Sequence, residues 1–159
     1  MRVRGTAEAL YIACEMEKRA IRLYERALAV FADGPCQEAI RDILLEERRH
    51  LIRFSEMSGE TPGFERAQLL AAQATKMLFS GGLMEAQRKG AFSSVLRLYQ
   101  YAAREEQEAA ARYGAFAAQL TGPAAEAFRQ IETEEKGHLN KLNDMIRACP
   151  DETGAEENE

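Results

Sequence analysis

The feature that most constrains this chain is an apolar pattern, spaced by three and four residues, that occurs twice. Residues 6–32 carry the pattern first, and residues 94–120 repeat it at matching positions. Residues 35–57 and 123–149 form a second matching couple. This spacing is typical of an amphipathic α-helix whose apolar side faces a partner. The sequence therefore predicts four long helices arranged as two related pairs.

The segments between these helices predict how the helices are connected. Asp33-Gly34-Pro35 and Thr121-Gly122-Pro123 are short turn signals within the two pairs. Residues 59–93 separate the pairs, and they contain a helical patch over 65–79 followed by a turn at Ser80-Gly81-Gly82. Two short-looped hairpins joined by a long crossover predict an all-α, antiparallel four-helix bundle of the ferritin type. We expect residues 1–150 to form this single domain and residues 151–159 to be a disordered acidic tail.

Composition excludes several classes of protein. The 26 acidic and 21 basic side chains give a net charge of -5, and no Lys or Arg cluster could follow a nucleic-acid backbone. A mean hydropathy of -0.41 and the lack of a long apolar run argue against a membrane span, and no signal peptide is evident, so we expect a cytoplasmic protein. Cys14, Cys36 and Cys149 form no Cys-x-x-Cys motif, which predicts buried, unreactive thiols rather than disulfides, a zinc ribbon or a rubredoxin-type iron site.

Four carboxylates interrupt the apolar stripes, one in each predicted long helix. They are Glu17, Glu47, Glu106 and Glu135. Burying even one unpaired ion costs several kcal/mol, so four in one core need compensation. Bound cations would supply it.

Both histidines of the chain strengthen the prediction of a metal site. His50 and His138 each follow a stripe glutamate by three residues, the spacing that directs two helical side chains to the same place. Glu-x-x-His on two helices and one Glu on each of the other two is the ligand set of carboxylate-bridged two-metal sites. We therefore predict two metal ions per chain. Oxygen and imidazole ligands without thiolate favour iron, with manganese as the alternative.

Other interpretations of these residues remain open. A single Glu-x-x-His is usually part of a solvated helix face, and a metal-free structural bundle is the contrasting hypothesis for the whole chain. Glu105 and Glu108 would replace Glu106 if the third long helix contained a π-bulge, although the apolar register favours Glu106.

Two pairs of polar residues lie near the predicted ligands. Tyr24 and Tyr113 stand two turns beyond Glu17 and Glu106, where their phenols could reach the site as catalytic groups or could be ordinary core residues. Glu46 and Glu134 precede the histidines by four residues, which fits a partner that orients the imidazole on the same helix or an exposed ion pair.

These residues resemble the rubrerythrin-like branch of the ferritin-like di-iron family. The resemblance covers nearly the whole chain, from Ala13-Cys14-Glu15-Met16-Glu17 and Leu23-Tyr24 to Glu134-Glu135-Lys136-Gly137-His138-Leu139. It implies that Glu47 and Glu135 bridge the metals. It also implies that each metal is completed by one Glu and one His, namely Glu17 with His50 and Glu106 with His138.

The resemblance implies a function as well. It makes the chain a candidate peroxidase that reduces hydrogen peroxide, with a ferroxidase that uses dioxygen, a dimanganese catalase and an iron-binding protein as alternatives. The chain lacks a rubredoxin domain, and Ala109 stands where rubrerythrins carry an additional Glu. Electrons would therefore come from a separate donor protein, and a homodimer is the assembly that the family implies. Arg48 replaces the haem-ligating Met of bacterioferritins, and a fifth helix is lacking, which argues against a storage cage.

Overall fold

A computed structural model describes residues 2–58 and 82–149, and all regular structure in these residues is helical. The long helices are α1 (Thr6–Val30), α2 (Gln37–Met57), α5 (Val95–Gln119) and α6 (Gly122–Ala148), and α4 (Gly82–Arg88) is short. No strand occurs within the described residues, so the all-α prediction is confirmed there. None of the helices in this part of the chain is both long and apolar enough to cross a membrane.

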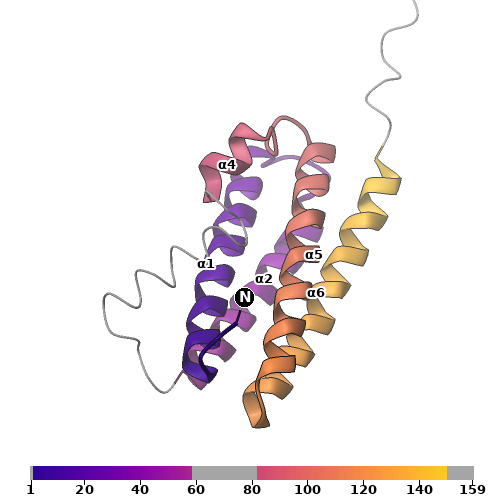
Figure 1. Cartoon of the computed structure of the whole chain (residues 1–159). Coiled ribbons are helices and arrows are strands. Elements are labelled where there is room, and N and C mark those ends of the chain that lie inside the picture. Colours follow the sequence, from indigo (N-terminus) through magenta and orange to yellow (C-terminus); the bar gives the residue numbers. More distant parts are fainter. Residues whose placement is uncertain (1, 59–81, 150–159) are drawn as a thin grey trace, which may run out of the picture.

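The helices form a bundle with two closely packed pairs, α1 with α2 and α5 with α6 (Figure 1). Further contacts join α1 to α5, α2 to α6, and α4 to α1. Each long helix turns an apolar stripe towards a shared core. The residues that interrupt this stripe therefore meet inside the bundle.

Aromatic rings fill the core on one side of the interrupting carboxylates. The Phe128 ring centroid lies 5.0 Å from that of Phe54, 5.7 Å from that of Tyr113 and 5.4 Å from that of Phe116. All four side chains are at most 1% exposed. Tilted and edge-on ring contacts of this kind pack tightly, so they fix the positions of the helices around the polar interior.

The long helices begin and end within a few residues of the predicted bounds. Ser94 caps α5, because its hydroxyl accepts a hydrogen bond from the Arg97 amide at 3.2 Å. α1 begins at Thr6, the first residue of the predicted range 6–32, with Gly5 before it. α2 begins at Gln37, two residues after the start of the predicted range 35–57, so Pro35 precedes this helix. Single caps and turn residues specify a helix end less strongly than the apolar stripe specifies its body.

The described part of the crossover contains a helix that the sequence pattern did not predict. α4 contacts α1, and its Ala86 is buried. The Ala91 amide donates to the Ala86 carbonyl at 2.9 Å, where Gly90 takes a φ of 75°. A helix of seven residues is too short for periodicity to reveal. The predicted patch over 65–79 and the acidic tail over 151–159 lie outside the described residues.

Candidate metal centre

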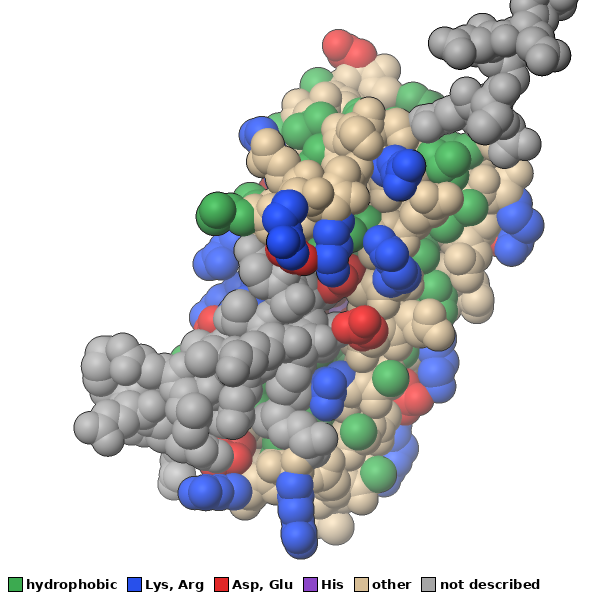
Figure 2. Space-filling model, turned by 45° about the horizontal axis from the view of Figure 1, so that its top comes forward, with side chains coloured by type: hydrophobic (Ala, Val, Ile, Leu, Met, Phe, Trp, Pro, Cys, Tyr) green, Lys and Arg blue, Asp and Glu red, His purple; other side chains and the backbone are tan. Residues whose placement is uncertain are grey.

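The predicted ligand residues come together inside the bundle from all four long helices. α1 supplies Glu17, α2 supplies Glu47 and His50, α5 supplies Glu106, and α6 supplies Glu135 and His138. Each is at most 3% exposed. Figure 2 agrees with this burial, since almost no histidine is visible on the face it shows.

These side chains form two groups, each able to hold a metal ion. One group contains Glu17, Glu47, His50 and Glu135, and the other contains Glu47, Glu106, Glu135 and His138. Within each group, one oxygen or nitrogen from every residue lies within 4.8 Å of the others. Glu47 and Glu135 belong to both groups, so a carboxylate from α2 and one from α6 lie between the two positions.

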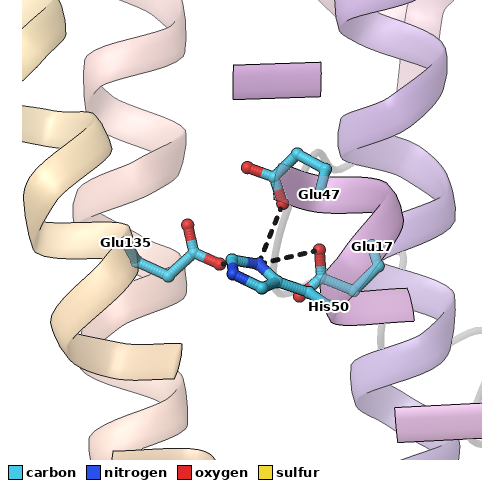
Figure 3. Close-up of side chains that lie close together, drawn as sticks. All are labelled: Glu17, Glu47, His50 and Glu135. Carbon is cyan, nitrogen blue, oxygen red and sulfur yellow. Dashed lines mark ion pairs between the residues drawn. The ribbon is translucent and has the colours of Figure 1, made fainter. Parts of the chain in front are cut away.

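The imidazole nitrogens point into this cluster of carboxylates. His50 Nδ1 lies 3.1 Å from Glu135 Oε1 and 3.5 Å from Glu47 Oε2. His138 Nδ1 lies 3.1 Å from Glu135 Oε2 and 3.0 Å from Glu47 Oε1. Figure 3 shows the first group, in which the carboxylates of Glu17, Glu47 and Glu135 lie around the His50 ring. They come from α1, α2 and α6, and dashed lines join the first two to the ring. Each shared carboxylate therefore offers one oxygen to each histidine.

Each histidine also lies near one unshared carboxylate. His50 Nδ1 is 3.8 Å from Glu17 Oε2, and His138 Nδ1 is 3.8 Å from Glu106 Oε2. The two halves of the cluster thus repeat the same geometry, as the repeated sequence pattern predicts.

Two buried polar atoms of the cluster lack a hydrogen bond. They are Glu47 Oε1 and His50 Nδ1. Ala20 and Ala109 help to line a small cavity among the carboxylates, because their short side chains leave space there. A carboxylate oxygen and an imidazole nitrogen without hydrogen bonds, beside a small cavity, are suited to bind a cation. These residues therefore fit the metal site that the sequence predicts.

Protons partly neutralise this cluster in the absence of metal. Burial and the charges of Glu47 and Glu135 raise the pKa of both Glu17 and Glu106 well above the usual range, which favours the protonated form of these two carboxyls. Burial alone would raise the pKa of Glu47, but the close contacts with the His138 and His50 imidazoles outweigh it and hold that pKa far below normal. Metal binding would therefore have to displace protons.

We expect the metal-free protein to lose stability as the pH rises from about 6.5 to about 10. Burial lowers the pKa of His50, but the contacts with Glu135 and Glu47 outweigh it and raise the pKa to about 10. In the unfolded chain the imidazole loses its proton near pH 6.5. The folded state thus binds more protons in this window, and its free energy of unfolding should fall by an amount on the order of a few kcal/mol.

Urea denaturation in the presence of a chelator, at pH 6.5 and at pH 9.5, measures this change. His50→Gln cannot hold the proton, so its free energy of unfolding should fall less over the same range. Equal pH dependence in the two proteins would contradict the explanation.

The two tyrosines predicted near the site contact the unshared carboxylates of the opposite half. The Tyr113 hydroxyl donates to Glu17 Oε1 at 2.5 Å, and the Tyr24 hydroxyl donates to Glu106 Oε1. Burial raises the pKa of both phenols, and the charges of nearby glutamates raise it further, so both remain protonated donors. These hydrogen bonds fix the orientation of Glu17 and Glu106 towards the cluster.

The outer nitrogens of the histidines bind carboxylates across the α2–α6 interface. His50 Nε2 pairs with Glu134 Oε2 at 2.8 Å, and His138 Nε2 pairs with Glu46 Oε2 at 2.7 Å. The spacing of four residues had suggested partners on the same helix. Glu46 and Glu134 instead reach the histidine of the other helix, because each lies one residue before an inward-facing glutamate and so borders the neighbouring helix.

The crossed pairing leads to a specific expectation for Glu134→Ala. The variant should weaken metal binding at the His50 position about 10- to 100-fold, the usual cost of removing a partner that orients a ligand. Cobalt(II) titration of double variants identifies the position affected. Glu134→Ala should add little to His50→Ala but should weaken binding further in His138→Ala, and the reverse pattern would show that the pairing lies within each helix.

The structure also distinguishes among the three acidic candidates on α5. α5 is a regular α-helix throughout, without a π-bulge. Glu106 lies in the second group. Glu105 is also buried, with 8% of its surface exposed, but it belongs to neither group, and Glu108 is exposed. The apolar register thus selected the carboxylate that faces the cluster.

Comparison of the chain with protein-family models, curated proteins and solved structures finds no significant match.

Proposed function

We propose that this chain is a rubrerythrin-like di-iron protein that reduces hydrogen peroxide in a ferritin-like, antiparallel bundle. The observation that carries the proposal is the sharing of Glu47 and Glu135 between two otherwise separate groups of ligands. A shared carboxylate suits two adjacent metals better than one, because each oxygen can bind a different ion. Glu17 with His50 would complete one position, and Glu106 with His138 the other.

The donor set supports iron, with manganese as the alternative. It contains carboxylate oxygens and imidazole nitrogens but no thiolate. Zn²⁺ usually takes fewer ligands in a tetrahedral site, whereas oxygen and imidazole ligands suit metals of higher coordination number. Two ions that each change oxidation state by one electron would supply the pair needed to cleave a peroxide O–O bond.

The protein side chains around the site would orient ligands and exclude water. Tyr24 and Tyr113 hold the unshared carboxylates, and the Phe54–Phe128 packing closes the core on one side. A surface pocket lined by Glu46, Arg49, His50 and Glu134 reaches the His50 ring from the outside of the bundle. A molecule as small as peroxide or dioxygen could approach the site through this pocket.

The reaction would need two electrons and two protons for each peroxide reduced to water. The chain contains no Cys-x-x-Cys motif that could hold a rubredoxin-type iron, so a separate protein would supply the electrons. A homodimer and a cytoplasmic location belong to the same proposal.

The test compares the two oxidants directly. The reduced, iron-loaded protein is mixed under anaerobic conditions with hydrogen peroxide or with dissolved O₂, and oxidation of the iron is followed by absorbance. We expect faster oxidation by peroxide. Faster oxidation by O₂ would favour a ferroxidase, and loss of peroxide without any reductant in the manganese-loaded protein would favour a catalase.

A further inference from the structure

Two cysteines far apart in the sequence occupy the same end of the bundle. Cys36 precedes α2 and Cys149 follows α6. In Figure 1 the C-terminal end of α6 lies at the top of the bundle, the end at which the chain passes from α1 into α2. Cys36 is fully buried in the core, and Cys149 is partly buried and packs against the same core.

The contacts between α2 and α6 define the register of the two helices, and this register shows which residues lie at the same level as each cysteine. Three side-chain contacts join the helices: Asp42 with Lys141, Glu46 with His138, and His50 with Glu134. Each advance of about one turn along α2 is therefore matched by about one turn backwards along α6. Arg53 with Gln130 continues this register at the far end.

The inward-facing contacts extend the register to the cysteines. Glu47 and His138 are 3.0 Å apart at the metal centre. Cys36 stands three helical turns before Glu47, and Cys149 stands three turns after His138. Because an α-helix returns to the same side after three turns, the two cysteines continue the same pair of facing stripes.

The electrostatics of the thiols agree with this placement. Burial raises the pKa of the Cys36 thiol, and the Cys149 sulfur raises it further. Burial together with both sulfurs raises the pKa of Tyr99, on α5, to about 12. These effects agree with a common location of the two sulfurs and Tyr99 at this end of the bundle.

We propose that Cys36 and Cys149 are an oxidisable pair that closes into an intramolecular disulfide joining the start of α2 to the end of α6. The sequence had predicted unreactive thiols, because spacing along the chain gives no sign of this pairing. The inference does not depend on the metal centre.

Hydrogen peroxide can act as the oxidant. The partly exposed Cys149 thiolate attacks one peroxide oxygen, the O–O bond breaks, and the products are a sulfenic acid and hydroxide, which takes a proton to become water. The Cys36 sulfur then attacks the Cys149 sulfur, an S–S bond forms, and the hydroxyl leaves as a second water with the Cys36 proton. Two thiols thus lose two electrons and one peroxide gains them.

The experiment treats the reduced full-length chain with hydrogen peroxide, blocks the remaining thiols with iodoacetamide and measures intact and peptide masses. We expect one blocked thiol, at Cys14, and a peptide pair linked through Cys36 and Cys149. The link should raise the thermal midpoint of the metal-free protein by roughly 10 °C, because it closes a very long loop. Dithiothreitol should reverse both changes.

Matched variants separate the proposed disulfide from the proposals about the metal centre. Cys14→Ser should keep the link, and Cys149→Ser should lose it together with the thermal shift. Glu47→Gln, which alters the metal centre, should still form the link. A link that involves Cys14, dimers joined through Cys149, or oxidation of Cys149 without any link would each overturn the proposal.

Discussion

Glu47→Ala is expected to lower the affinity for both metal ions by about 100-fold and to abolish the reaction with peroxide. Glu47 faces both histidines, with Oε1 3.0 Å from His138 Nδ1 and Oε2 3.5 Å from His50 Nδ1. Removing it therefore takes a ligand from each position at once. Metal analysis after equilibrium dialysis and the rate of iron oxidation by peroxide measure the two effects.

Glu105→Ala is the matched control for this loss. Glu105 is also a buried carboxylate in the middle of a long helix, but it lies outside both ligand groups. The variant should keep both metals and most of the activity. Glu47→Gln preserves the side-chain volume, so it tests whether the effect of Glu47→Ala comes from a folding defect. Circular dichroism should show unchanged helix content in Glu47→Ala, Glu47→Gln and Glu105→Ala. Two tightly bound metals in Glu47→Ala would exclude the bridging role.

His50→Ala is expected to leave one metal bound per chain. His50 belongs to only one of the two groups, so the Glu106–His138 position keeps its complete set of donors. The affinity at the affected position should fall by about 10- to 100-fold. A site with one remaining metal should lose the two-electron reaction with peroxide, because the second electron would have no nearby source.

Cobalt(II) absorption titration would resolve the number of sites and their affinities. His138→Ala is the matched variant, because the other half of the cluster repeats the same geometry, and it should give the same stoichiometry. Loss of both metals from either single variant would indicate that the two positions fill only together, contrary to this expectation.

Much of the helical architecture could be predicted because one physical signal repeats along the chain. An apolar stripe specifies the body of a helix over many turns, and each long helix has such a stripe. α4 was not predicted because it is short, and α2 begins two residues later than predicted because helix ends depend on a few weak local contacts.

The positions of the candidate ligands followed from the same signal, because a glutamate in an apolar stripe must face the core. Glu106 was preferred over Glu105 on this ground, and the structure places it beside His138. Partners across the bundle could not be derived in this way. The pairing of Glu134 with His50 depends on the relative rotation and register of α2 and α6, and spacing within a single helix does not contain that information.

The pairing that we propose for Cys36 and Cys149 could not be derived from the sequence for the same reason. It depends on the register between α2 and α6, which the Asp42–Lys141 and Glu46–His138 contacts define. In this bundle, the pattern within each helix predicts which residues face inward, and the register between helices decides what they meet.

The number of metal ions bound by the protein tests the central proposal most directly. The chain should be produced and purified without chelators, supplied with iron(II) under anaerobic conditions, freed of unbound metal and analysed by plasma mass spectrometry. The shared carboxylates predict close to two iron ions per chain, and Glu47→Ala should retain far less. A stoichiometry near zero in the wild-type protein would contradict the proposal and would favour a metal-free structural bundle.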